Sequence, residues 1–234
     1  ARALARRRFA GRRLFITLTG APFLLPVAVA VMGLLAVFGA RGWLNAAAGT
    51  LGLGPWRIYG LHGVVLAHVF FNLPLATRIL LQGWQAIPAE RLRLAASLRL
   101  NPWAVFVTLE WPLVRRLLPG AMAVIFAICL TSFAVALTLG GGPRATTVEL
   151  AIYQAMRFDF DLARASALGL VQLGLGLGAG ALALWLARGE GMGTGRDRPQ
   201  MRWDGQGPGA RAWDAVWIVA GAAFLLLPLG AVVW

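Results

Sequence analysis

The sequence has few charged residues, no lysine and a single cysteine. Charged residues make up 13% of the chain, well below the roughly 25% that is usual in soluble domains. Hydrophobic residues make up 59% of it, and the mean hydropathy is +0.71. This composition excludes an ordinary soluble domain and predicts a membrane protein.

Potential metal ligands are also scarce. Cys129 lies inside an apolar run, so neither a disulfide within this sequence nor a thiol metal site is expected. The two histidines and nine acidic residues form no ligand cluster, and we therefore expect no metal and no cofactor. The net charge of +13 is carried by arginines beside apolar runs. That pattern favours membrane lipid over nucleic acid as the partner.

Five apolar segments are candidates for membrane-spanning helices. Each has about 20 residues or more, enough at ~1.5 Å per residue to cross a hydrocarbon core of ~30 Å. They predict an all-α, polytopic helical bundle. Because the first residue is not Met and the last apolar segment runs to the final residue, we expect further chain at both ends. The segments are residues 15–39, 61–82, 119–139, 165–187 and 213–234.

The arginines are distributed unevenly among the loops. They are abundant before the first segment, in the loop 83–118 and between the fourth and fifth segments, and they are sparse in the other two loops. Positive charge favours the cytoplasmic side of a membrane. The N-terminus and the loop 83–118 are therefore predicted to be cytoplasmic.

The loop 83–118 is polar enough to stay outside lipid and has signals for two short helices. Pro88 suits a first helical position, and Glu90 suits the positive end of that helix. Asn101 is a candidate cap for a second helix with Pro102 in its first turn, and Pro112 lacks the donor that would continue this helix. We expect a helix, an elbow and a second helix.

The second segment contains polar residues that are costly in lipid. His68 and Asn72 either line a translocation path or have structural roles, with Asn72 bonding carbonyls that Pro74 leaves free and Arg78 reaching the cytoplasmic surface.

Small residues and caps mark the later part of the chain. Glycines four residues apart, at 174 and 178 and at 176 and 180, predict close approach of a partner helix. Residues 140–143 predict a flexible exit from the membrane. Thr146 and Glu149 predict a capping box for a short outer helix, which lies either on the membrane surface or on the protein's own loops.

The loop resembles the cytoplasmic motif of ABC-importer permeases, which reads Glu-Ala-Ala, three residues, Gly, nine residues and Ile-x-Leu-Pro. Aligning Ala95 and Pro112 reproduces the spacing of this motif. The residue types differ at five motif positions, which hold Arg93, Leu94, Arg99, Leu109 and Trp111.

Longer segments resemble the thiamine importer permeases in particular. They are His68–Arg78, Glu110–Pro112 and Gly140–Ala155, the last continuing through Asp159, Asp161, Ala163 and Arg164. The likeness implies a partial type I importer permease (MetI-like) fold in the bacterial inner membrane. Residues 1–187 would form a first unit without its opening helix or helices, residues 188–212 a cytoplasmic linker, and residues 213–234 the first span of a second unit.

The resemblance also implies partners and functional residues. The permease would work with a cytoplasmic ATPase dimer, which hydrolyses ATP, and with a periplasmic substrate-binding protein. Because Arg99 stands at the motif's Gly, either the first helix runs straight through it or the elbow moves to Asn101 and Pro102. The residues implied in coupling to the ATPase are Leu94, Ala95, Ala96, Ser97, Leu98, Arg99, Pro102, Glu110, Trp111 and Pro112.

Thiamine is an aromatic cation, so a path lined by aromatic and polar side chains is expected. The candidates are His68, Phe70, Phe71, Asn72, Ser132 and Phe133. An alternative solute is ferric iron or another small molecule, since importers of many solutes share the loop motif. An intramembrane enzyme with His68 and Ser132 as base and nucleophile is a second alternative without supporting spacing. A structural scaffold is a third, and it leaves the loop unexplained.

Overall fold

The computed structural model describes residues 1–20, 22, 25–53, 55–140, 145–187 and 207–232. Over these residues the chain forms helices and no β-strand, which confirms the all-α prediction. The elements are α1 (Arg2–Arg6), α2 (Arg12–Leu18), α3 (Val27–Phe38), α4 (Trp43–Thr50), α5 (Leu61–Gln85), α6 (Ala89–Ser97), α7 (Pro102–Val105), the π-helical segment η2 (Phe106–Glu110), α8 (Trp111–Leu130), α9 (Phe133–Leu139), α10 (Val148–Arg157), α11 (Leu162–Ala187) and α12 (Pro208–Ala231).

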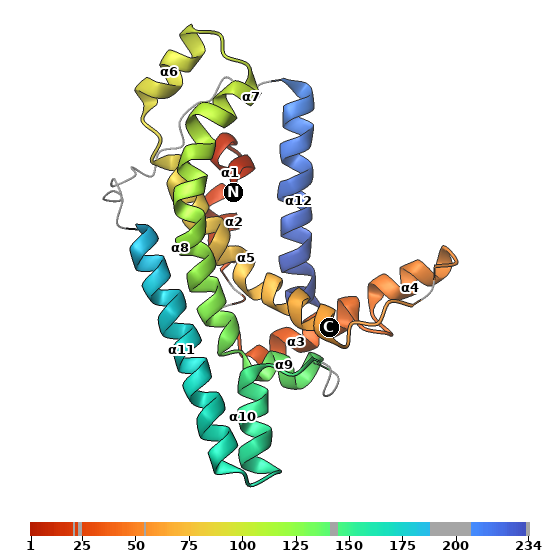
Figure 1. Cartoon of the computed structure of the whole chain (residues 1–234). Helices are drawn as coiled ribbons and strands as arrows, with labels where there is room; N and C mark the ends of the chain where they lie inside the picture. Colours follow the sequence, from red (N-terminus) through yellow and green to blue (C-terminus); the bar gives the residue numbers. More distant parts are fainter. Residues whose placement is uncertain (21, 23–24, 54, 141–144, 188–206, 233–234) are drawn as a thin grey trace.

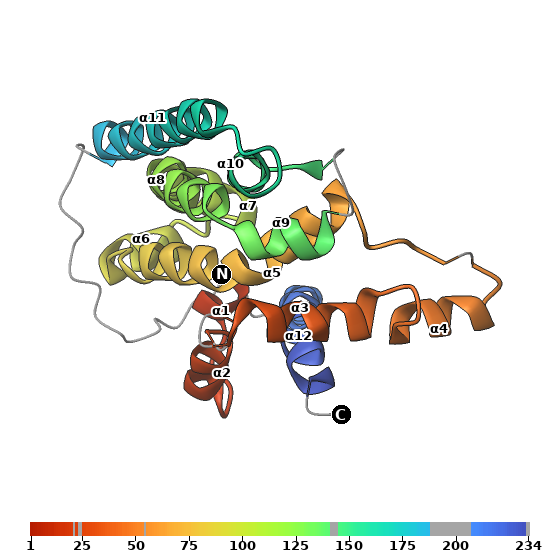
Figure 2. The same ribbon diagram turned by 90° about the horizontal axis from the view of Figure 1, so that it is seen from below.

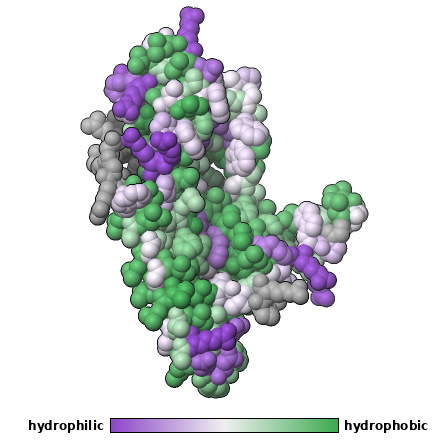
Figure 3. Space-filling model, in the orientation of Figure 1, coloured by the Kyte–Doolittle hydropathy of each residue, from purple (hydrophilic) through white to green (hydrophobic). Residues whose placement is uncertain are grey.

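Five helical segments are long and apolar enough to cross a membrane, as predicted. α8 and α12 run from the α6 end toward the opposite end of the molecule and α11 runs back, whereas α3 and α4 lie across them (Figures 1 and 2). Hydrophilic residues gather at the α6 end and at the turn between α10 and α11, and the surface between is mostly hydrophobic (Figure 3). The five segments are Val27–Thr50, Leu61–Gln85, Pro102–Leu130, Leu162–Leu186 and Pro208–Ala231.

The prediction of one continuous helix over 15–39 is wrong. α2 ends at Leu18, and α3 begins only after Pro26, which is its N-cap. The chain turns where the Thr19 hydroxyl donates to the carbonyl of Ile16 at 2.8 Å. Pro22 and Pro26 have no N–H to continue the helix, so the break follows from signals that hydropathy alone does not weigh.

The third segment also differs from its prediction, because the helix starts earlier and ends earlier. Pro112 does not stop it: the N–H of Trp111 donates to the carbonyl of Phe106, five residues back, and this π-helical turn continues into α8. α8 then ends at Leu130 rather than at residue 139. The hydroxyls of Thr131 and Ser132 bond back to carbonyls at 3.1 and 2.8 Å and so compete with the helical ladder.

The elbow between α6 and α7 is closed by two backbone hydrogen bonds. The N–H of Arg99 donates to Ala96 and that of Leu100 to Ala95, which is a Schellman motif. Arg99 has φ = 49°, so both expected arrangements, a straight helix through Arg99 and an elbow moved to Asn101, are wrong at this residue. The cap prediction is confirmed, since the side chain of Asn101 accepts from the N–H of Ala104 at 2.7 Å.

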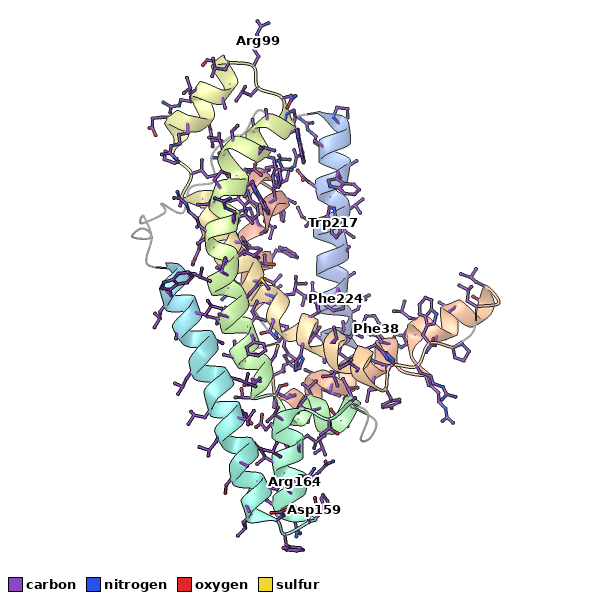
Figure 4. The ribbon with its side chains drawn as sticks, viewed as in Figure 1. Phe38, Arg99, Asp159, Arg164, Trp217 and Phe224 are labelled. Atoms are coloured by element: carbon purple, nitrogen blue, oxygen red, sulfur yellow. The ribbon has the colours of Figure 1, made fainter. Side chains whose placement is uncertain are left out.

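α12 is packed against α3 and α5 through aromatic rings. The ring of Phe224 lies 6.0 Å from that of Phe38 and 5.9 Å from that of Phe70, centroid to centroid, and Figure 4 shows Phe38 and Phe224 facing each other. Leu34 and Leu139 are fully buried in the same core.

α12 begins at Pro208, inside the expected linker. Residues 188–206 of that linker, 141–143 of the expected exit and 233–234 of the last expected span lie outside the described residues.

The expected capping box of α10 is not formed as predicted. Thr147, not Thr146, is the N-cap, and its side chain accepts from the N–H of Leu150 at 3.3 Å. Glu149 accepts a hydrogen bond from the backbone of Phe133 instead, where α9 begins. Burial raises the pKa of the Glu149 carboxyl, and this hydrogen bond partly offsets the rise. α10 itself packs on α9 and α11.

The positive φ of Arg99 predicts that a glycine at this position stabilises the protein. Arg99→Gly removes the cost of the left-handed conformation and is expected to raise the free energy of unfolding by about 1 kcal/mol. The measurement is unfolding in mixed micelles, followed by circular dichroism. Arg93→Gly, within α6, is the matched control and is expected to lower stability by about 1 kcal/mol. Equal losses for both variants would contradict the Schellman geometry.

The raised pKa of Glu149 predicts a pH dependence. Because the folded carboxyl holds its proton more tightly than the unfolded one, its contribution to stability is present at low pH and is lost as the pH rises through the folded pKa. The free energy of unfolding of the wild type, relative to Glu149→Gln, should therefore fall as the pH rises above the ordinary pKa of a glutamate carboxyl. Unfolding titrations of both proteins, with Glu90→Gln as a surface control, measure this difference. A relative rise over that range would contradict the sign.

Candidate functional site

The α6–α7 elbow presents apolar side chains at the far end of the molecule. Leu94, Leu98 and Trp103 are 60, 62 and 71% exposed, and Arg99 lies at the tip and points away from the protein (Figure 4). Leu92 and Ala95 face inward and are buried. The elbow therefore offers an exposed apolar surface on a helix that is anchored from its other side.

The residues proposed for coupling do not all share this surface. Of these, Ala95 and Glu110 are buried and Ala96 is half-buried. The others are exposed: Leu94, Ser97, Leu98, Arg99, Pro102, Trp111 and Pro112.

Glu110 is held by arginines of α1. Its carboxylate is fully buried, with Arg2 Nε at 2.6 Å and Arg6 Nη2 at 3.8 Å. The guanidinium of Arg2 also lies 4.9 Å from the ring centroid of Phe106. Removing one partner of such a buried pair costs about 3–5 kcal/mol, since the other charge stays buried without compensation.

A second acid, Asp214 of α12, pairs with the same helical region. Asp214 is 4% exposed. Two nitrogens of Arg7, Nε and Nη2, lie 2.7 and 2.6 Å from Oδ2 of Asp214. In the sequence these arginines indicate membrane orientation, and they do not predict either contact. The acids lie 108 and 207 residues away along the chain, so no local signal predicts them.

A polar cluster forms where α5 meets the end of α8. His68 Nε2 is hydrogen-bonded to Ser132 Oγ. Asn72, which is 4% exposed, donates to the carbonyl of His68 at 2.9 Å and to Cys129 Sγ at 3.4 Å. The Oδ1 atom of Asn72 is buried and has no hydrogen-bond partner among the described residues. Three of the predicted path residues, His68, Asn72 and Ser132, are thus brought together.

The cluster has a hydrogen-bond direction that does not suit nucleophilic catalysis. The Ser132 hydroxyl donates its one proton to the carbonyl of Cys129 at 2.8 Å, because a carbonyl only accepts. His68 Nε2 must then donate to Ser132 Oγ. A base that activates serine needs the opposite direction, so this arrangement disfavours the His68–Ser132 enzyme hypothesis.

The aromatic path candidates make ring contacts with other aromatic side chains. The ring of Phe133 lies tilted against that of Tyr153 of α10, with centroids 4.8 Å apart, and Phe71 packs edge-on against buried Phe70 at 5.4 Å. The role of Asn72 differs from the expected structural one. Its side chain bonds the carbonyl of His68, one turn back in the same helix, instead of a carbonyl that Pro74 leaves free. Arg78 is exposed and donates to the carbonyl of Ile16 at 3.3 Å.

A buried asparagine outside the predicted set fixes the segment that carries α4. Asn45 Nδ2 donates to the carbonyls of Gly39 and Trp56 at 2.7 and 2.8 Å, and Asn45 Oδ1 accepts from the N–H of Trp56 at 2.8 Å. These bonds tie both ends of the projecting arm together (Figure 1).

Comparison with known proteins reveals extensive similarity to one group of transport proteins. The chain is 53% identical over 165 residues to the thiamine transport system permease protein ThiP of Escherichia coli (strain K12), covering 70% of this chain and 31% of that protein. It is 48% identical over 166 residues to ThiP of Brucella abortus (strain 2308), covering 70% and 30%. The chain thus spans about a third of the length of these relatives.

A more distant match is the molybdenum transport system permease protein ModB of Azotobacter vinelandii, at 33% identity over 131 residues, covering 56% of this chain and 58% of that protein. No family model and no solved structure matches the chain. Over 70% of its length, this polytopic all-α membrane chain is similar to the thiamine transport system permeases.

Proposed function

We propose that this chain is part of the permease of an ATP-driven importer in the bacterial inner membrane, and that its solute is thiamine. The identity of 53% to the Escherichia coli thiamine permease carries the proposal, and the five apolar helices support a transport role. The chain is a transport subunit rather than an enzyme. A separate cytoplasmic ATPase dimer hydrolyses ATP, and a periplasmic substrate-binding protein delivers the solute.

The proposed orientation places the α6 end in the cytoplasm, as the arginine distribution supports. Residues 1–187 form most of a first permease unit, residues 188–212 a linker and residues 213–234 the first span of a second unit. The share of the thiamine permeases that this chain matches, 31% in Escherichia coli, supports a longer protein of this kind.

The exposed apolar residues of the elbow support docking of an ATPase. Leu94 and Leu98 of α6 and Trp103 of α7 form a surface that costs free energy in water. A groove on the ATPase would bury it, and closure of the ATPase dimer on ATP would then move α6. Ala95 is buried on the inner side of α6, and Glu110 is held by Arg2 and Arg6 of α1.

The polar cluster supports a solute path between α5 and α8. Within the part of the chain that the structure describes, Asn72 Oδ1 is a buried acceptor without a partner, and such an acceptor gains a hydrogen bond when a donor passes. The amino group of the thiamine pyrimidine is such a donor. The cluster is closed in this structure, so α5 and α8 must separate before the solute reaches Asn72.

A different small solute is the second candidate. The match to the molybdenum transport permease supports it, and ferric iron is the other solute to be tested. The lower identity of that match, 33% against 53%, favours thiamine.

Uptake of labelled solutes tests the proposed function. Cells that lack their own thiamine uptake, and that express the permease with its ATPase and binding protein, should accumulate thiamine but not ferric iron or molybdate. Asn72→Leu should lower thiamine uptake by roughly tenfold, the loss expected from one hydrogen bond of about 1.4 kcal/mol in the rate-limiting state.

Thr138→Val is the matched control for Asn72→Leu. It removes a hydroxyl that bonds back to the carbonyls of Ala134 and Val135 in its own helix, so uptake should be unchanged when the protein is present in equal amounts. Uptake of molybdate or iron in place of thiamine would contradict the solute assignment. Full thiamine uptake by Asn72→Leu would contradict the path.

A further inference from the structure

α1 is a short helix between two parts of the molecule. Its buried residues Leu4 and Ala5 pack with Leu81 of α5. Partly buried side chains, among them Ile218 of α12, pack against this cluster. Figure 1 shows α1 between α12 and the bundle of α5, α7 and α8. The apolar face of α1 therefore fixes where Arg2 and Arg6 lie, and with them Arg7, the C-cap residue that follows α1.

These arginines reach in two directions. Arg2 and Arg6 pair with Glu110 at the end of η2, and Arg7 pairs with Asp214 near the start of α12. Both acids are buried. α12 makes its other main contacts with α3, near the opposite end of the molecule, so α1 is the main contact of α12 at the elbow end.

The π-helical turn explains why Glu110 is available for this pairing. One extra residue in the turn over Phe106–Glu110 rotates the chain relative to a regular helix. Trp111 and Pro112 stay exposed while Glu110 points inward, away from solvent. α7, η2 and α8 follow one another without a break and carry Glu110, and α6 joins them through the elbow. A displacement of α6 that moves α7 would therefore also move the carboxylate of Glu110.

Paired charges at a buried site resist separation. Moving Glu110 away from Arg2 and Arg6 would leave charges without compensation in a poorly solvated place. The same holds for Asp214 and Arg7. The least costly motion keeps both pairs, so that η2, α1 and α12 move together.

We propose that α1 is an ion-pair clasp, formed by Arg2, Arg6 and Arg7 with Glu110 and Asp214, that transmits motion of the elbow to α12. Arg7 and Asp214 are positioning residues, since they act through α1 and touch neither solute nor ATPase. This inference rests on the proposed function, in which the ATPase moves α6. It adds a route by which that motion reaches α12, the helix that would be the first span of the second permease unit.

Distance measurements between spin labels test the clasp. Labels carried on unnatural amino acids, which leave Cys129 in place, replace Leu98 on the elbow or Trp217 on α12, each paired with a label at Leu170 of α11. All three side chains are at least 58% exposed. The complete permease is measured with its ATPase, with and without ATP. In the unmodified protein both distances should change on ATP binding.

Arg7→Gln should keep the ATP-dependent change at the elbow and lose the change at α12. Thiamine transported per ATP hydrolysed should fall by roughly tenfold, within the range of coupling between linked sites. Exchanging the charges, with Arg7→Asp and Asp214→Arg together, should restore the change at α12. Arg13→Gln removes the same charge from an exposed position of α2 and should change neither distance.

The outcomes separate the clasp from the function on which it rests. If the elbow does not move with ATP in the unmodified protein, the ATP-coupled function and the clasp are both wrong. If the elbow moves and α12 responds equally in Arg7→Gln, the clasp alone is wrong. Loss of both changes in Arg7→Gln and in the charge-exchanged protein would assign Arg7 to folding and would likewise overturn the clasp.

Discussion

Every bend in a membrane helix must supply partners for the backbone groups that it leaves unpaired, and this requirement determines the shape of the chain. At the end of α8, the hydroxyls of Thr131 and Ser132 bond to carbonyls, and Gln172 of α11 donates to the carbonyl of Leu130 at 3.4 Å. Asn45 does the same for the segment around α4. Because Ser132 is fixed at such a bend, it meets His68 and completes the polar cluster.

Hydropathy predicted the membrane segments well where the helices are continuous. α5 and α11 extend the predicted ranges by only a few residues at their ends. Hydropathy failed at 15–39 and 119–139. An average over apolar residues does not register the missing backbone donor of Pro22, or the Ser132 hydroxyl that competes with the hydrogen bonds of the helix. Pro112 predicted a helix end that the structure does not have, since a π-helical turn accommodates this proline.

The candidate site was predictable residue by residue but not as an arrangement. Polar residues in an apolar run marked His68, Asn72 and Ser132, and the structure groups all three. The contacts of the α1 arginines were not predictable, because their acids are distant along the chain and one sequence carries no pairing information. Arg99 stands at the Gly position of the motif, and its φ of 49° shows that this non-glycine residue adopts the left-handed conformation.

We propose that the elbow docks on a cytoplasmic ATPase and passes its motion to membrane helices. The most direct measurement is photo-crosslinking from a benzoylphenylalanine at Leu98, in the complete permease co-expressed with its ATPase. A crosslink to the ATPase from Leu98, and none from the equally exposed surface at Leu170 on α11, is the predicted result. Absence of the Leu98 crosslink in every nucleotide state, with the ATPase present in equal amounts, would contradict the account.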